Sequence, residues 1–60
     1  MKTNFYIDGN KVSRREAFSR IGSNQMNLYL EEAKECYKDD PLVAIDFYLG
    51  SRGMLTIEFE

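Results

Sequence analysis

The last third of the chain decides the fold: residues 42–60 read LVAIDFYLGSRGMLTIEFE. Apolar residues alternate with polar or small ones on both sides of the central Gly-Ser-Arg-Gly segment, as in strands with one buried face. The sequence therefore predicts two strands, residues 42–49 and 54–60, that pair antiparallel as a hairpin. A three-residue loop at residues 51–53, with Gly53 in the left-handed conformation, brings the apolar sets onto one side. These sets are Val43, Ile45, Phe47 and Leu49 on the first strand and Leu55, Ile57 and Phe59 on the second.

The same register predicts which side chains lie on the other face of this hairpin. It places Asp46 opposite Glu58, Tyr48 opposite Thr56 and Ala44 opposite Glu60. Like charges directly opposite each other destabilise a sheet, so the pair of Asp46 and Glu58 needs an explanation.

Three interpretations of this acidic pair stay open. The first is a solvated face, with the carboxylates screened by Lys2, Lys11 or Arg52, or a different register of the two strands. The second is an acidic and aromatic patch that accepts a basic partner. The third is a carboxylate pair for metal or acid–base chemistry, which an open sheet face disfavours because it has no pocket to separate two carboxylate pKa values.

Residues 4–13 predict a smaller hairpin. Phe5 and Ile7 alternate with Tyr6, and the following Asp-Gly-Asn segment contains the residue types that tight turns require. A two-residue loop at residues 9–10 places Ile7 opposite Val12, so that apolar residues lie side by side. With Phe5 and Ile7 facing the core, Tyr6 and Asn4 lie on the outer face.

A short helix is predicted directly after this hairpin. Ser13 and Glu16 have capping-box spacing, in which the Ser13 hydroxyl accepts from the Glu16 N–H and the Glu16 carboxylate accepts from the Ser13 N–H. Gly22 is expected to end the helix. Its inward residues are Ala17, Phe18 and Ile21.

A longer helix is predicted from a cap at Ser23 or Asn24 to about Lys38, where Pro41 prevents its continuation. Apolar residues recur every three or four positions, so one stripe faces the core. Cys36 lies on this stripe and is expected to be buried as a small apolar residue. The stripe consists of Met26, Tyr29, Leu30, Ala33, Cys36 and Tyr37.

Together these elements predict an α+β domain in the order ββααββ, with residues 1–60 forming one small domain. Two hairpins join into one antiparallel sheet, and the short and the long helix pack on one of its faces. The order of the strands in the sheet stays open.

Composition excludes several classes of function. The 60 residues include no histidine and one cysteine, which excludes Ser-His and Cys-His couples, histidine or multi-cysteine zinc sites and an intrachain disulfide. The start of the chain lacks the apolar run of a secretory signal, and no segment approaches the roughly 18 apolar residues of a membrane span. We therefore expect a cytoplasmic, non-catalytic protein without a cofactor or a bound metal.

Charge is distributed unevenly and points to binding. Residues 1–23 hold five basic and two acidic side chains, whereas residues 24–60 hold three basic and eight acidic ones. We expect docking onto a larger protein with a basic surface, such as a nucleic-acid-binding channel. By analogy of design, the chain has the form of a phage- or mobile-element-type inhibitor. The predicted partner-binding residues are Tyr6, Glu31, Glu35, Asp46, Tyr48, Glu58 and Glu60.

Two other modes of binding stay open. A small nucleic-acid-binding or regulatory protein would use the basic residues of the first third to contact phosphates. These residues are Lys11, Arg14, Arg15 and Arg20. Alternatively, a homodimer could form through exposed strand edges.

Overall fold

The computed structural model describes residues 2–39 and 44–60. The predicted helix stop at Pro41 and the predicted inward position of Val43 lie outside the described residues. In chain order the elements are β1 (Thr3–Ile7), β2 (Asn10–Val12), α1 (Arg14–Ile21), α2 (Ser23–Asp39), β3 (Ala44–Tyr48), a short 3₁₀ turn η1 (Gly50–Arg52) and β4 (Met54–Phe59).

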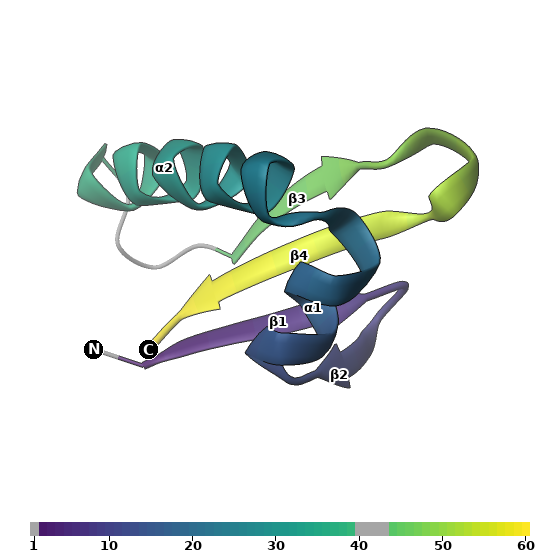
Figure 1. The fold of residues 1–60 in the computed structure, drawn as a ribbon. Coiled ribbons are helices and arrows are strands. Elements are labelled where there is room, and N and C mark those ends of the chain that lie inside the picture. The colour runs from purple at the N-terminus through teal and green to yellow at the C-terminus, as the bar shows by residue number, and fades with distance from the viewer. Residues whose placement is uncertain (1, 40–43) are drawn as a thin grey trace.

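The four strands form one antiparallel sheet in the order β2-β1-β4-β3 (Figure 1). The first and last strands are therefore the central pair, and the described ends of the chain lie close together. β2 and β3 form the two edges. The α+β class, the element order ββααββ and the packing of the short and the long helix on the sheet are confirmed.

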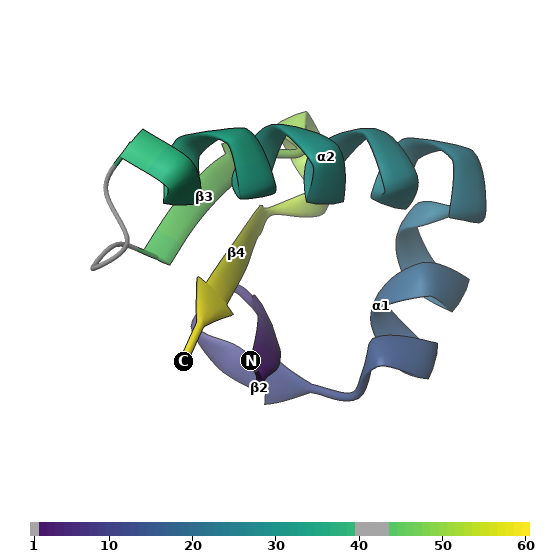
Figure 2. The ribbon, with the colours of Figure 1, turned by 90° about the vertical axis from the view of Figure 1, so that its left-hand side faces the viewer.

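The core lies between the sheet and the two helices (Figure 2). α1 packs against β1, and α2 packs against β3 and β4. Met26 of α2 and Leu55 and Ile57 of β4 are fully enclosed, and each such side chain contributes about 1.5–3 kcal/mol through its removal from water. Two aromatic contacts join α2 to the sheet: Tyr29 with Phe47 at 4.7 Å between ring centroids, and Tyr37 with Phe59 at 5.0 Å.

The turn of the first hairpin differs from the prediction. Phe5 pairs with Val12 and Ile7 with Asn10, so the two-residue loop is Asp8-Gly9 rather than the predicted residues 9–10. Asp8 and Gly9 both have positive φ, 52° and 82°, as a type I′ turn requires. Asp8 is held there because its carboxylate accepts a 3.0 Å hydrogen bond from the Met54 N–H at the start of β4.

The register of the second hairpin also differs from the prediction, by two residues. The loop is Gly50–Arg52, with Gly50 at φ 66°, and the Leu49 N–H donates to the Gly53 carbonyl at 2.8 Å. A loop that begins one residue earlier keeps every side chain on its predicted face but changes its partner. The register therefore places Asp46 opposite Thr56, Ala44 opposite Glu58 and Tyr48 opposite Met54.

Gly53 and Asp8 account for this choice of loop. Gly53 has φ 99° and ψ −146°, a conformation reserved for glycine rather than the predicted left-handed one. A Cβ atom on Gly53 would also overlap the Asp8 carboxylate, whose Cγ would lie at 2.7 Å. The contact between Asp8 and Met54 thus sets the residue at which β4 begins.

The helices follow the sequence with three corrections. The Ser13 hydroxyl accepts from the Glu16 N–H at 3.0 Å as predicted, but the Glu16 carboxylate pairs with Arg20 at 3.3 Å. Gly22 ends α1 as predicted, and α2 begins immediately at Ser23, which leaves no separate cap. Cys36 is exposed and lies outside the stripe of α2 that meets the sheet, which consists of Met26, Leu30, Ala33 and the half-buried Tyr29 and Tyr37.

Candidate partner-binding surface

The face of the sheet opposite the helices brings together five of the seven predicted partner-binding residues. They alternate along their strands with residues of the core or of the helix-facing side, and therefore point away from the helices. We call this surface the outer face. Its predicted members are Tyr6 on β1, Asp46 and Tyr48 on β3, Glu58 on β4 and Glu60 directly after β4.

Asn4 of β1 organises the acidic part of the outer face. Its side chain is only 5% exposed and is the one buried polar side chain among the described residues. Its Nδ2 donates to Glu58 Oε1 at 3.1 Å and also to Glu60 Oε2, while the Tyr6 hydroxyl donates to Glu58 Oε1 at 3.2 Å. The carboxylates of Glu58 and Glu60 thus both accept a hydrogen bond from the Asn4 amide.

Sequence reasoning placed Asn4 on this face but missed its role. Asparagine is depleted in strands, so an asparagine inside a predicted strand is the signal that could have identified it. Its partners are more than 50 residues away in sequence, and only the pairing of β1 with β4 brings them together.

Asp46 is also held by a neutral partner. The Thr56 hydroxyl donates to Asp46 Oδ1 at 2.7 Å across the pair of β3 and β4. The shifted register places Glu58 diagonally across from Asp46 rather than directly opposite, so the predicted repulsion is weakened.

The negative charge of the outer face is not neutralised by ion pairs. Among the described residues, the ion pairs are those of Arg20 with Glu16 and of Lys38 with Glu35, both away from this face. Lys2 and Lys11 also lie on this face, Lys2 opposite Glu60 and Lys11 opposite Tyr6 on the edge strand β2, and their charges partly offset those of the carboxylates. Hydrogen bonds from neutral amide and hydroxyl groups orient the carboxylates.

Tyr6 responds to this charge. Partial burial raises the pKa of Tyr6 above its ordinary value of 10.0, and the neighbouring Glu58 carboxylate raises it further. Glu58 acts both by its charge and by accepting the hydroxyl proton, and the charge of Glu60 adds to the effect. The phenol therefore stays neutral and acts as a donor to Glu58 at physiological pH.

Tyr48 projects from the edge of the same face. It is 85% exposed, which makes it the most exposed large side chain of apolar character in the described chain. Tyrosine combines a rigid apolar ring with a hydrogen-bonding group and is enriched at protein interfaces.

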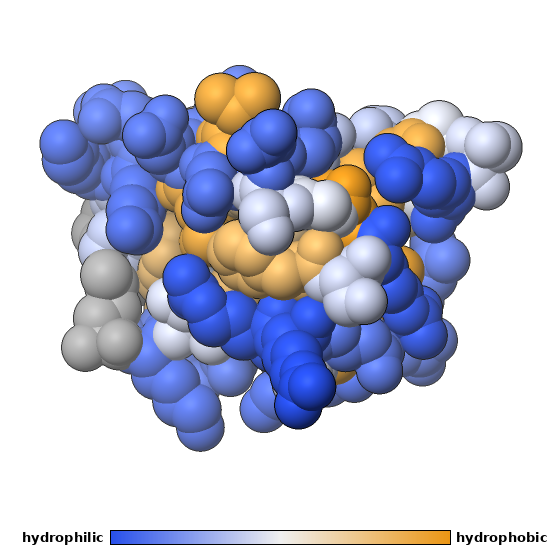
Figure 3. All heavy atoms as spheres, in the orientation of Figure 1, coloured by the Kyte–Doolittle hydropathy of each residue, from blue (hydrophilic) through white to orange (hydrophobic). Residues whose placement is uncertain are grey.

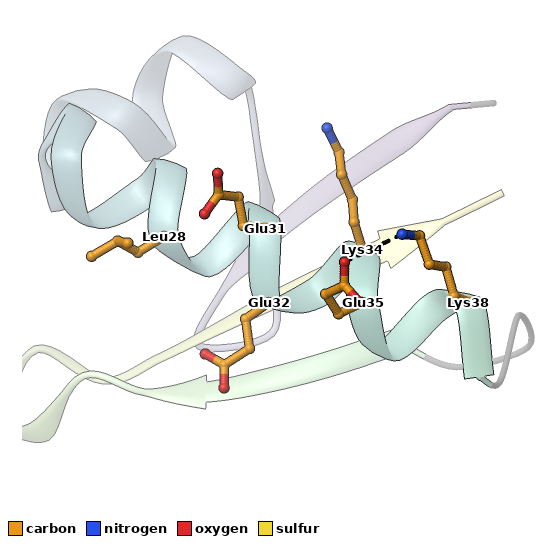
Figure 4. Close-up of a pocket in the computed structure, with 6 residues that line it drawn as sticks. All are labelled: Leu28, Glu31, Glu32, Lys34, Glu35 and Lys38. Atoms are coloured by element: carbon orange, nitrogen blue, oxygen red, sulfur yellow. Dashed lines mark hydrogen bonds and ion pairs between the residues drawn. The ribbon is translucent and has the colours of Figure 1, made fainter.

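Glu31 and Glu35, the two predicted partner-binding residues of the long helix, lie apart from the outer face. They lie on the exposed side of α2, whereas the outer face is on the opposite side of the sheet. A shallow depression on this helix is lined by Leu28, which is 59% exposed, and by Glu31, Glu32, Lys34, Glu35 and Lys38 (Figure 4). Lys38 lies 3.3 Å from Glu35 and partly neutralises this second surface.

The four basic residues of the alternative interpretation are dispersed. Lys11 lies on the outer face, beside the acidic cluster. The Arg14 guanidinium stacks over the rings of Phe18 and Phe5, at 5.0 and 5.9 Å from their centroids, and Arg20 pairs with Glu16. Arg15 is exposed on α1.

Hydrophilic side chains cover most of α2 and the lower part of the molecule on the helix-bearing side (Figure 3). Apolar atoms are visible there mainly in a band between α2 and the elements below it. Within residues 2–39 and 44–60, no group of three or more acidic or cysteine side chains could hold a metal ion. Neither described helix combines the length and the apolar character that crossing a bilayer requires. Comparison of the chain with protein families, with curated proteins and with solved structures finds no match.

Proposed function

We propose that this chain is a non-catalytic binding protein that docks through its outer face onto a basic surface of a larger protein. The observation that carries the proposal is the set of three carboxylates, Asp46, Glu58 and Glu60, each held by a neutral hydrogen-bond donor. If these carboxylates served only to stabilise the fold, lysine or arginine partners would serve equally well. Neutral donors orient the carboxylates without forming ion pairs with them.

Preorganisation is the physical advantage of this arrangement. A flexible glutamate that binds a basic partner loses rotamer freedom, which costs about 0.5–1.5 kcal/mol per immobilised side chain. Asn4 and Tyr6 restrict Glu58 before any partner arrives, and Thr56 restricts Asp46 in the same way. Binding then requires little further ordering of these side chains.

A nucleic-acid-binding channel is the kind of basic surface that such a face would fit. Channels of this kind carry arrays of lysine and arginine that contact phosphates, and an array of carboxylates satisfies the same electrostatic requirement. A protein that occupies the channel would block the binding of nucleic acid and so act as an inhibitor. By analogy of design, this is the form of a phage- or mobile-element-type inhibitor of a host nuclease. The exposed ring of Tyr48 would supply apolar contact area beside the charges.

The test compares two neutralised variants, one that removes three charges from the outer face and one that removes two from the exposed side of α2. The outer-face variant carries Asp46→Asn, Glu58→Gln and Glu60→Gln, and the matched helix variant carries Glu31→Gln and Glu35→Gln. Each is used as bait in extracts of the source cell, and the captured proteins are identified by mass spectrometry. We expect the outer-face variant to lose a partner that the wild type and the helix variant both retain.

Two results would count against the proposal. Equal capture by the outer-face variant and the wild type would show that the outer face is not the binding surface. A gel shift of nucleic acid by the wild-type chain at low salt, lost at higher salt, would instead support direct phosphate contact by the basic residues.

A further inference from the structure

The two edges of the sheet differ in how they are protected. β2 is three residues long and carries Lys11 at its centre, and short length and lysine both discourage pairing with another chain. β3 spans five residues, Ala44–Tyr48, and its single charged side chain, Asp46, is engaged by Thr56. In the described part of the chain, β3 pairs with β4 on one side and has no strand on the other.

Hydrogen bonding between β3 and β4 determines which backbone groups of β3 remain free. The bond from the Leu49 N–H to the Gly53 carbonyl marks these residues as a hydrogen-bonded pair. Because such pairs alternate along an antiparallel ladder, Phe47 and Ile45 also bond to β4. The N–H and C=O groups of Asp46 and Tyr48 therefore point away from the sheet and form an open row.

The helix-facing side chains of this edge are incompletely covered. Leu55 and Ile57 on the central strand β4 are completely buried, whereas Ile45, Phe47 and Leu49 are only half-buried. α2 packs against β3 from the helix side (Figure 2), and in the described chain no strand lies beside the outer edge of β3. An added strand with apolar residues on its helix-facing side would cover these side chains.

We propose that β3 pairs antiparallel with β3 of a second copy of this chain, in the register that places Phe47 opposite Phe47. In this register Ile45 lies opposite Leu49 of the second copy, and Asp46 lies opposite Tyr48. The free backbone groups of Asp46 then face those of Tyr48, so the ladder continues with hydrogen-bonded pairs in phase. The three half-buried apolar side chains cover one another.

Side-chain pairing selects this register from its two neighbours. Moving the centre by one residue to Asp46 places two aspartates directly opposite each other, which destabilises the pair. Moving it to Tyr48 places Ile45 opposite Ser51, outside the strand, and loses an apolar pair. The Phe47-centred register avoids both costs and pairs the apolar residues of two identical edges with each other, which argues for a second copy.

The expected product is a symmetric dimer with one continuous eight-stranded sheet, since each copy contributes four strands. The two outer faces would lie side by side and stay uncovered, so this inference is independent of the proposed docking function. A five-residue edge is a small interface, below the roughly 1,200 Å² of stable specific complexes. Association is therefore expected at high protein concentration.

Sedimentation equilibrium and amide hydrogen exchange test the dimer on the wild-type chain. The expected mass rises from 7.0 kDa toward twice that value between micromolar and millimolar concentration. Over the same range the Asp46 and Tyr48 amides become protected from exchange while the Lys11 amide, on the other edge, does not. A monomer at every concentration, or a dimer without protection of these two amides, would overturn the proposal.

A pair of proline variants provides a matched control. Tyr48→Pro removes an outward N–H of β3 and no bond to β4, whereas Lys11→Pro removes the equivalent outward N–H of β2. Circular dichroism verifies that both variants fold. We expect Tyr48→Pro to abolish dimerisation and Lys11→Pro to leave it unchanged. The reverse pattern would place the contact at β2 instead of β3 and overturn the proposal.

Discussion

Replacement of Asn4 by aspartate tests how the acidic cluster of the outer face is held together. Aspartate has nearly the same shape as asparagine but, when ionised, cannot donate a hydrogen bond. Asn4→Asp therefore removes the two bonds to Glu58 and Glu60 and places a third carboxylate between them. The site is 95% buried at this residue, so water cannot fully replace the lost donors.

The magnitude follows from these contacts. A hydrogen bond to a charged group contributes about 1.5–3 kcal/mol, and the exposure of Glu60 favours the lower end, so the two lost bonds cost about 3 kcal/mol. Two unit charges at 4 Å repel by about 4 kcal/mol at an effective dielectric constant of about 20. The new carboxyl group would limit this repulsion by binding a proton, which raises its folded pKa above its unfolded value.

The sign of the pH dependence is set by that raised pKa. The protonated form is the one compatible with the fold, so the variant approaches its greatest stability below the unfolded pKa of about 3.9 and loses it as the pH rises through the folded pKa. A 60-residue domain typically unfolds with about 3–9 kcal/mol, so the variant is expected to be largely unfolded at pH 7.

Urea unfolding followed by circular dichroism measures this effect at about pH 4 and at pH 7. Asn4→Ala is the matched control, because it removes the same donor without adding a carboxylate. We expect the free energy of unfolding of the aspartate variant to fall below that of the alanine variant at pH 7 and to approach it near pH 4. Equal losses in the two variants at pH 7 would contradict the convergence of the Glu58 and Glu60 carboxylates on residue 4, and no loss in the alanine variant would refute the role of Asn4 as their donor.

Three further predictions address the turn, the tyrosine and the helix cap. Gly53→Ala should lower the free energy of unfolding by about 3 kcal/mol, since backbone strain of about 1–3 kcal/mol adds to the overlap with the Asp8 carboxylate. Asp8→Ala in the same chain should recover part of this loss, and strictly additive losses would contradict the overlap. Glu58→Gln should lower the pKa of Tyr6 toward 10.0 in an NMR titration, and an unchanged pKa would contradict the contact. In the wild type, the stability linked to neutral Tyr6 should be lost as the pH rises through the raised pKa of Tyr6. Ser13→Ala should cost about 1 kcal/mol in urea unfolding through loss of the α1 cap, and an unchanged unfolding midpoint would show that the cap contributes nothing.

The sequence predicted the faces of the strands because side-chain direction alternates with a period of two. Ile45 and Phe47 therefore point toward the helices and Asp46 and Tyr48 away from them, as expected. The registers could not be predicted in the same way. Gly50 and Gly53 permit two three-residue loops that differ by two residues in register, and both loops preserve the faces.

Long-range contacts decided between such alternatives. In the second hairpin the decision rests on Asp8, whose carboxylate binds the Met54 N–H from 46 residues away. In the first hairpin, placing apolar residues side by side did not discriminate, because Phe5 opposite Val12 satisfies that criterion as well as the predicted pairing of Ile7 with Val12.

The sequence predicted which residues lie in the candidate site but not the contacts that hold them together. Tyr6, Glu58 and Glu60 are brought together, yet the Asn4 amide that joins them depends on β1 lying beside β4, and the strand order had been left open. Glu31 and Glu35 were predicted on the acidic side of the long helix, and they lie there, on the exposed side of α2.

The affinity of the captured partner for the outer-face variant is the most direct test of the central claim, that the carboxylates of the outer face bind a basic surface. Isothermal titration calorimetry gives the Kd of the partner for the wild type, for the outer-face variant with Asp46→Asn, Glu58→Gln and Glu60→Gln, and for the helix variant with Glu31→Gln and Glu35→Gln. At about 1 kcal/mol per neutralised contact, the outer-face variant should bind roughly a hundredfold more weakly, while the helix variant matches the wild type. An unchanged Kd for the outer-face variant would contradict the claim.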